Sequence, residues 1–191
     1  MKTIVITPEV QAKGEIDTCN LLLKSNIERL HVRKPFASIE SMRDYISALD
    51  SQYYHKISLH SHHGLVDEMK LGGKHFKSDQ QVVKAKGLVS KSFHSLNELE
   101  FETKTLSYGF LSPIFESISK VCYASEFEMD DLKQKLRSFN NFPIYALGGI
   151  EMDKIKEVKD LGFSGVALLG TIWLEDKIEK RGEITEAILN A

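Results

Sequence analysis

Eight short runs of apolar and β-branched residues recur along this chain, and most are separated by segments with a helix-like pattern. Few of the runs alternate strictly with polar residues, which is typical of strands covered on both faces of a parallel sheet. The predicted strands are Thr3–Thr7, Arg29–Arg33, Lys56–Ser61, Lys74–Ser78, Leu88–Ser92, Tyr108–Phe115, Pro143–Gly149 and Gly165–Gly170.

The apolar spacing changes to a helical period between these runs. Ile39, Met42, Ile46 and Leu49 fall on one helical face, and Ser38 is placed to cap the first turn. Ser95 and Glu98 have capping-box spacing directly after the fifth run. Further helices are predicted over 152–161 and 176–189, with weaker patterns at 65–71 and 80–84, where the second segment is long enough for only one turn.

Eight alternating units predict an α/β fold, a compact (β/α)8 TIM barrel that forms a single domain over residues 1–191. Each unit has roughly 24 residues, enough for a strand of about five residues, a helix of about ten and short loops. An open, doubly wound sheet is the alternative architecture.

Charge and cysteine content exclude several classes of partner. The formal net charge is -2 and no cluster of Lys and Arg forms a basic arm, so neither nucleic acid nor a membrane surface is an expected partner. Cys19 and Cys122 form no CxxC pattern, and the chain starts on a strand-like run rather than a signal peptide. We therefore expect a soluble cytoplasmic protein with free thiols. The sequence leaves open whether it forms a homo-oligomer.

Small residues follow the seventh and eighth predicted strands. In a (β/α)8 barrel these two loops commonly bind phosphate, because their backbone N–H groups can approach an anion where no side chain intervenes. The alternative is that the glycines only turn the chain. The candidate phosphate-binding residues in these loops are Gly148, Gly149, Gly170 and Thr171.

The segment from Ser112 to about Asp130, after the sixth run, lacks a clear period and is longer than a connection requires. It contains Ser117, Ser119 and Lys120, whose hydroxyl and ammonium groups suit an anionic oxygen. Long loops at the active face of a barrel are usually functional, although a simple insertion is the alternative.

Five motifs in register on these strand ends resemble the thiamine-phosphate synthase and thiazole tautomerase superfamily. They are "HVRK", "SKSFHS", "LSPIFESISK", "IYALGGI" and "GFSGVALLGTIW", and the resemblance extends from Ile4 to about Trp173. It implies a (β/α)8 barrel that binds small phosphorylated substrates. The synthases of this superfamily join hydroxymethylpyrimidine diphosphate to thiazole phosphate and release pyrophosphate, whereas the tautomerases isomerise a thiazole carboxylate phosphate.

The resemblance also implies roles for individual residues. Arg33 matches an arginine that holds the diphosphate, and Ser92 and His94 match a Ser-x-His pair near the reacting centre. Ser117, Ser119 and Lys120 match a Thr-x-Thr-Lys segment that meets phosphate or pyrophosphate oxygens. The thiazole-phosphate loops correspond to Gly148, Gly149, Gly170 and Thr171.

The positions that would bind magnesium depart from the family pattern. An Asn-Asp pair after the third strand is replaced by His60-Ser61, and the aspartate after the fourth strand is displaced by one position, to Asp79. The family's second cation after Arg33 is replaced by Pro35, with Lys34 one place early. Magnesium is therefore an open expectation, and no residue is assigned to a metal.

Three further readings remain. A tautomerase-like isomerase would need a new base, because Pro113 occupies the position of that branch's histidine; the candidates are His31, His60, His62, His63, His75 and His94. The other readings are a non-catalytic thiazole-phosphate-binding protein and another phosphate-binding barrel.

The segment His60–His63 ("HSHH") offers nitrogens that transition metals favour, but strand alternation and a turn are expected to scatter its rings.

Overall fold

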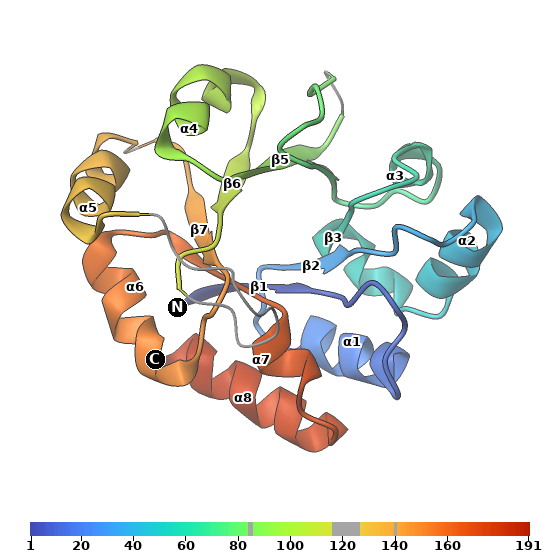
Figure 1. Cartoon of the computed structure of the whole chain (residues 1–191). Helices are drawn as coiled ribbons and strands as arrows, with labels where there is room; N and C mark the ends of the chain where they lie inside the picture. Colours follow the sequence, from blue (N-terminus) through green and yellow to red (C-terminus); the bar gives the residue numbers. More distant parts are fainter. Residues whose placement is uncertain (84–85, 116–126, 140) are drawn as a thin grey trace.

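Eight parallel strands form a closed barrel in the computed structural model, which describes residues 1–191 except 84–85, 116–126 and 140. The strands pair in chain order, and β1 pairs with β8 to close the ring (Figure 1). Their bounds are β1 Lys2–Ile6, β2 Arg29–Val32, β3 Ile57–Leu59, β4 Gly73–Phe76, β5 Leu88–Phe93, β6 Tyr108–Leu111, β7 Ile144–Leu147 and β8 Gly165–Leu168.

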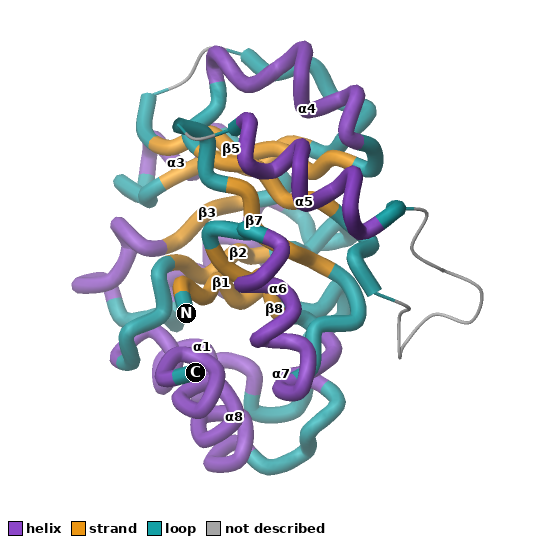
Figure 2. Tube along the Cα trace, turned by 90° about the vertical axis from the view of Figure 1, so that its left-hand side faces the viewer, coloured by secondary structure: helices purple, strands orange, loops and turns teal. Residues whose placement is uncertain are grey.

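Helices follow most strands and surround the barrel. Figure 2 shows the strands inside this layer, with the C-terminus at the end of α8, and the Met1 amino group donates to the Leu189 carbonyl oxygen of this helix at 2.6 Å. The helices are α1 Glu15–Lys24, α2 Ile39–Ser47, α3 Gly64–Glu68, α4 Leu96–Glu102, α5 Met129–Ser138, α6 Ile155–Leu161, α7 Gly170–Trp173 and α8 Ile178–Asn190. The described residues also contain three 3-10 turns: η1 Ser51–Lys56, η2 Thr103–Thr105 and η3 Met152–Lys154.

The prediction of a (β/α)8 barrel is confirmed, and the β1–β8 pairing excludes the open sheet. Each predicted strand contains or overlaps its observed counterpart. Ser38 caps α2 as expected, since its Oγ accepts the N–H of Ser41 at 3.1 Å. The helix predicted at 80–84 is wrong for its described part, where 80–83 are not helical and a turn precedes them. The sequence patterns did not identify α1 or α5.

The barrel interior is divided into an apolar half and a polar half. On the side of β1 and β6 to β8, the inward side chains include Ile4, Phe110 and Ala167, which belong to one buried apolar cluster. On the side of β2 to β5, buried polar residues take their place, among them Arg29, His31, Ser58, His75 and Ser90.

The polar half is held together by side-chain hydrogen bonds. Arg29 Nε donates to Ser58 Oγ at 2.9 Å, and a ring nitrogen of His31 lies 2.7 Å from the Tyr108 hydroxyl. In the described part of the chain, every buried side-chain nitrogen or oxygen has a partner. Because an unpaired buried polar group typically costs about 1–3 kcal/mol, this pairing is what makes a polar barrel interior stable.

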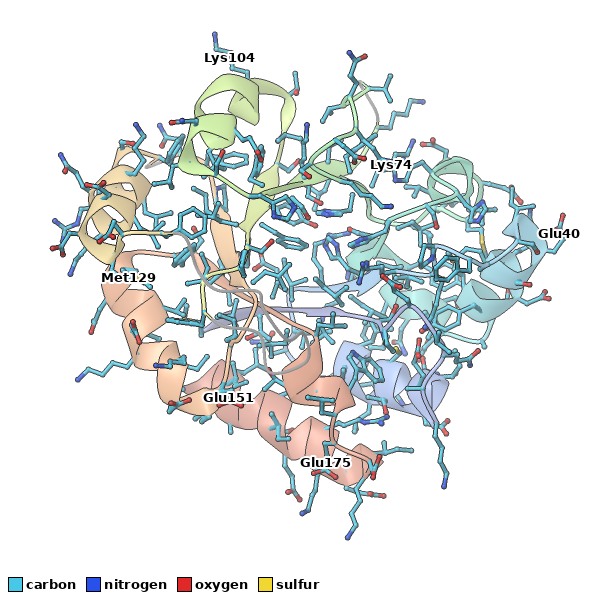
Figure 3. The ribbon with its side chains drawn as sticks, in the orientation of Figure 1. Glu40, Lys74, Lys104, Met129, Glu151 and Glu175 are labelled. Atoms are coloured by element: carbon cyan, nitrogen blue, oxygen red, sulfur yellow. The ribbon has the colours of Figure 1, made fainter. Side chains whose placement is uncertain are left out.

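A larger apolar core fills the space between the barrel and its helices, and it is built from outward-facing strand residues such as Val5, Leu30 and Val166. Charged side chains, including the labelled Glu40, Lys104 and Glu175, point away from the barrel (Figure 3). Among the helices that the structure describes, none is long and apolar enough to cross a membrane.

Candidate active site

A pocket of about 890 Å³ opens at the carboxyl ends of the strands. Residues that follow β1 to β8 line it, so each strand or its loop contributes to one cavity. This is the end of a (β/α)8 barrel at which catalytic and binding residues are normally found.

The structure brings together all the sequence-predicted site residues that it describes. They come from strands, loops and a short helix far apart in the chain, yet each contributes to the wall of the same pocket. The residues are Arg33, Ser92, His94, Gly148, Gly149, Gly170 and Thr171. Ser117, Ser119 and Lys120 lie outside the described residues.

The glycine pair after β7 makes a sharp turn against the loop after β6. Gly148 and Gly149 have φ of 94° and 64°, in the left-handed region that glycine adopts without a steric penalty. A Cβ atom at Gly148 would lie 3.0 Å from both Cα and Cβ of Pro113. The close approach of these two backbones therefore requires a residue with no side chain at position 148.

The β7 and β8 loops are joined to each other and to the barrel. The Thr171 hydroxyl donates to the Ile150 carbonyl oxygen, and Trp173 Nε1 donates to the Ile6 carbonyl oxygen at 2.7 Å. Thr171 thus uses its hydroxyl proton within the protein, so the donor that it can offer an anion in the pocket is its backbone N–H.

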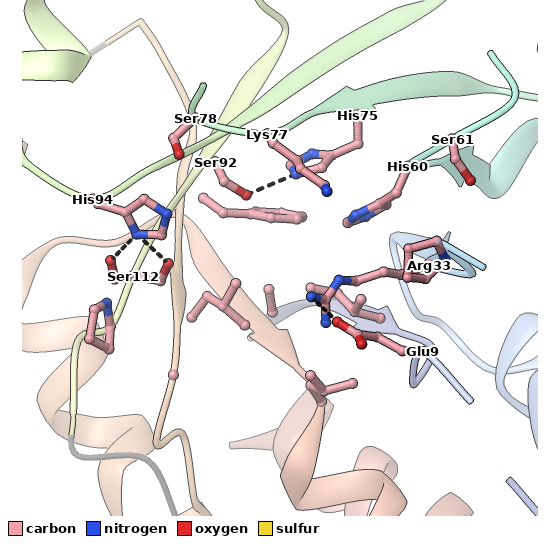
Figure 4. Close-up of a pocket in the computed structure, with 18 of the residues that line it drawn as sticks. Glu9, Arg33, His60, Ser61, His75, Lys77, Ser78, Ser92, His94 and Ser112 are labelled. Carbon is pink, nitrogen blue, oxygen red and sulfur yellow. Dashed lines mark hydrogen bonds and ion pairs between the residues drawn. The ribbon is translucent and has the colours of Figure 1, made fainter. Parts of the chain in front are cut away.

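Cationic side chains lie on another part of the wall. Arg33 Nη2 contacts Glu9 Oε1 at 2.5 Å, with the two side chains 32% and 40% exposed. Lys77, just after β4, extends toward His60 and His75 (Figure 4). An anion in the pocket could therefore contact two cations, provided that Arg33 is shared with, or released by, Glu9.

His94 and Ser92 lie on the wall formed by β5. Nδ1 of His94 is 2.9 Å from the Ser112 carbonyl oxygen, so this nitrogen carries a proton and, in the neutral ring, Nε2 is an acceptor. Ser92 Oγ lies 2.9 Å from Nε2 of His75 (Figure 4). Both residues can therefore exchange hydrogen bonds with a bound molecule.

Three histidines cluster at the inner end of the pocket, and two of them, His60 and His75, line it. His31 and His75 are buried and His60 is half-buried. Burial lowers the pKa of His75 to about 3, and burial together with the neighbouring His75 holds the pKa values of His31 and His60 well below their usual value. At neutral pH these rings are therefore uncharged.

Lys34 does not take part in this cationic wall. Its ammonium lies 2.6 Å from Glu15 Oε1 and donates to the Pro8 carbonyl oxygen at 2.6 Å, with its side chain 7% exposed. The early position of this lysine in the sequence directs it away from the pocket and into contact with α1.

Glu9, Lys77 and Ser112 line the pocket but were not singled out from the sequence, and His75, which also lines it, was named only as one of six candidate bases. Glu9 and Lys77 could have been identified from the sequence, since Glu9 is a charged residue that follows a predicted strand and Lys77 is one that lies near the end of another. His75 lies on a strand and Ser112 directly follows one, and only the register of the barrel shows whether a side chain at these positions faces the cavity.

The rings of His62 and His63 contact the carbonyl oxygens of Ala37 and His75, so "HSHH" is scattered as expected.

The sequence comparisons agree with the geometry. Residues 62–172 match the family model described as thiamine monophosphate synthase. The chain is 32% identical over 97 residues to a thiamine-phosphate synthase of Proteus mirabilis, covering 50% of this chain and 45% of that protein. It is 28% identical over 110 residues to a thiamine-phosphate synthase of Prochlorococcus marinus, covering 56% and 31%. These alignments thus span less than half of each relative's length.

Solved structures match over nearly the whole chain. A thiamine phosphate pyrophosphorylase from Bacteroides thetaiotaomicron superposes with a TM-score of 0.85 at 26% identity, covering 100% of this chain and 96% of the other. One from Pyrococcus furiosus has a TM-score of 0.79 at 20% identity, covering 99% and 96%, and supports the fold alone. With a matching family model over more than half of its residues, the chain belongs to the thiamine monophosphate synthase family.

Proposed function

We propose that this protein is a transferase of the thiamine-phosphate synthase type, which joins hydroxymethylpyrimidine diphosphate to thiazole phosphate and releases pyrophosphate. The observation that carries the proposal is the set of residues that line one pocket. Glycine loops after β7 and β8 and cations after β2 and β4 contribute to a single cavity, with Ser92 and His94 also in its wall. Such a cavity suits two phosphorylated molecules at once.

The reaction breaks the bond between the pyrimidine methylene carbon and the diphosphate oxygen. The thiazole nitrogen forms a new bond to that carbon, and the electron pair of the broken bond leaves with pyrophosphate. No proton needs to move in this step, so catalysis depends on stabilising the negative charge that develops on the leaving group. In this proposal Arg33 and Lys77 stabilise the leaving pyrophosphate.

The nucleophile must also be held in position. The thiazole nitrogen must be held close to the methylene carbon, and its phosphate is the natural handle. We assign this phosphate to the loops of Gly148, Gly149, Gly170 and Thr171. Hydrogen bonds to a charged group contribute about 1.5–3 kcal/mol each, so a few would hold the substrate firmly. Ser92 and His94 then orient the reacting groups.

Magnesium does not fit the described residues as a protein-held ion. It prefers carboxylate and phosphate oxygens in octahedral geometry. The pocket carboxylates in the described part of the chain are Glu9, which is bound to Arg33, and Asp79. Neither carboxylate has two further potential metal ligands beside it among the described residues. The three potential ligands that do lie together there are the histidines His31, His60 and His75. The roles assigned above are therefore limited to the protein's own side chains and backbone.

A second candidate function is isomerisation of a thiazole carboxylate phosphate. The observation that favours it is that His60, His75 and His94 all line the pocket, which could replace the base absent at Pro113. The low pKa of His75 makes that ring a weak base. His94, with an acceptor Nε2, is the better candidate for moving a proton.

The test is an assay of pyrophosphate release. Purified protein is incubated with both phosphorylated substrates, with and without magnesium, and each substrate alone is the control. Release that requires both substrates is the expected result. Conversion of the thiazole carboxylate tautomer, lost in His94→Ala, would instead establish the isomerase. Calorimetric binding of thiazole phosphate without any turnover at high enzyme concentration would mean a binding protein.

A further inference from the structure

Three histidine rings from successive strands converge inside the barrel. His31 is on β2, His60 directly follows β3, and His75 is on β4. The centroid of the His31 ring lies 5.2 Å from those of His60 and His75, and the His60 and His75 centroids are 4.1 Å apart. One ring nitrogen from each lies within 4.8 Å of the other two.

Polar groups orient two of these rings from outside the cluster. Nε2 of His31 is 2.7 Å from the Tyr108 hydroxyl, and Nδ1 of His75 is 2.9 Å from Ser90 Oγ. When these nitrogens carry the ring protons, His31 Nδ1 and His75 Nε2 present lone pairs. Histidines that bind metals are usually oriented in this way, by a hydrogen bond from the nitrogen that does not bind.

The remaining two hydrogen bonds of the cluster use the nitrogens that face its centre. A bound metal ion could take the place of both hydrogen bonds. Nδ1 of His31 lies 3.0 Å from Nε2 of His60, and Nε2 of His75 lies 2.9 Å from Ser92 Oγ. A zinc ion bonded at 2.0–2.1 Å in tetrahedral geometry needs nitrogens about 3.4 Å apart. The nitrogens observed within 4.8 Å of one another reach this spacing by small rotations of the side chains.

The donor type at this cluster favours a metal that prefers nitrogen ligands, although the same pocket also holds the cations Arg33 and Lys77. The Phe110 ring stacks on His75 at 4.8 Å and packs on His31 at 4.9 Å, which forms an apolar floor. Imidazole suits zinc and its transition-metal neighbours, whereas magnesium prefers oxygen. His60 and His75 also line the pocket, so a fourth coordination position would face the cavity. Three histidines with one open position is an arrangement found in catalytic zinc sites.

We propose that His31, His60 and His75 bind a divalent transition metal of the zinc class, with one coordination position open to the pocket. The proposal for this metal site does not depend on the reaction proposed above. It depends on the positions of the three histidine rings, and metal binding can be measured without any turnover. The protein ligands of the site are three imidazole nitrogens, a donor type that suits zinc, copper, iron and nickel.

Cobalt titration tests the site directly. Protein without a histidine tag is treated with chelator, dialysed and titrated with Co²⁺, and the visible absorption of four-coordinate cobalt is recorded. One equivalent of binding, competed by Zn²⁺ and not by Mg²⁺, is expected. His60→Ala should weaken Co²⁺ binding by about 100-fold or more, since loss of an outer-shell partner alone typically costs about 10–100-fold. The matched control is His55→Ala, an exposed histidine on η1 that should bind as the parent does.

Two further measurements separate a lost ligand from a lost fold. Tyr108→Phe keeps the ring but removes the hydroxyl that orients His31, and it should weaken Co²⁺ binding by about 10-fold. Zn²⁺ should raise the melting temperature of the parent and of His55→Ala, but not that of His60→Ala, whose metal-free melting curve verifies folding. Absence of a cobalt band, or parental affinity in His60→Ala, would overturn the metal site. An unchanged cobalt spectrum on adding inorganic phosphate would overturn the open coordination position.

Discussion

Gly148 is the residue at which backbone geometry and proposed substrate binding are most closely linked. Its φ is 94°, and a Cβ would lie 3.0 Å from Pro113. We predict that Gly148→Ala destabilises the fold by about 1–3 kcal/mol and raises the KM for the thiazole phosphate, because the strained loop shifts away from Pro113. Urea unfolding and steady-state kinetics measure the two effects.

Gly64 supplies the matched control for this change. It begins α3, and a Cβ built there meets no atom within 4 Å. Gly64→Ala should therefore change stability by less than about 1 kcal/mol and leave KM unaltered. If the two alanine variants behaved alike, the steric role of Gly148 would be wrong.

Arg33 tests the cationic wall. Arg33→Ala should lower kcat/KM by about 10- to 100-fold, the equivalent of one charged hydrogen bond of about 1.5–3 kcal/mol. Stability should change by less than about 1 kcal/mol, because the pair with Glu9 is partly exposed. Arg43→Ala breaks a comparable exposed pair, with Glu68 on α3, and should leave turnover intact. A similar loss of activity in both variants would remove Arg33 from the site.

At the scale of elements, a buried ion pair connects α1 with the loop after β2. Lys34 Nζ and Glu15 Oε1 are 2.6 Å apart, with the side chains 7% and 0% exposed. The Tyr45 hydroxyl, from α2, donates to the same carboxylate oxygen at 2.6 Å. The pair, together with Tyr45, therefore connects α1, the loop after β2 and α2.

Breaking this pair should be costly, because the remaining charge stays buried. We predict that Glu15→Gln and Lys34→Met each lower the free energy of unfolding by about 3–5 kcal/mol, and that the double variant loses clearly less than the sum. Lys2→Met disrupts an exposed pair with Glu28 and should cost less than about 1 kcal/mol. Strictly additive losses in a urea-based double-mutant cycle would contradict the coupling.

The same network explains why α1 was difficult to predict. Two of its buried positions are polar: Glu15, paired with Lys34, and Thr18, whose hydroxyl accepts a hydrogen bond from Arg181 at 3.0 Å. These residues interrupt the apolar stripe that identifies an amphipathic helix. By contrast, α2 and α6 keep such a stripe, and they were predicted from spacing alone.

At the scale of the whole molecule, the buried histidines make stability depend on pH. The pKa of His75 falls from about 6.5 in an unfolded chain to about 3 in the fold. Between these values the unfolded chain binds a proton that the folded protein does not, so stability is full above pH 6.5 and is lost as the pH falls. His31 and His60 act in the same direction.

For metal-free protein we predict that the free energy of unfolding decreases from pH 7 to pH 5, by up to about 1.4 kcal/mol per pH unit for each of these histidines below pH 6.5. His75→Asn should reduce the slope, whereas His55→Ala, at an exposed position, should reduce it far less. Urea unfolding at several pH values measures the slope. An unchanged slope in His75→Asn would show that folding does not lower the pKa of His75.

The sequence alone determined the barrel and the position of its glycine loops. Eight apolar runs of strand length, separated by helix-length segments, leave few ways to cover both faces of every strand. The small residues at Gly148 and Gly170 were recognisable because each lies at the end of a predicted apolar run. Local patterns were sufficient for these features because each depends on neighbours in the sequence.

Only the tertiary structure decided which side chains meet inside the ring. His31, His60 and His75 are separated by 29 and 15 positions, and their convergence depends on the register of β2, β3 and β4. A shift of one residue would turn each ring from the barrel interior to the helical layer. Register is set by the closed barrel as a whole, so no local pattern could show that these three residues share one site.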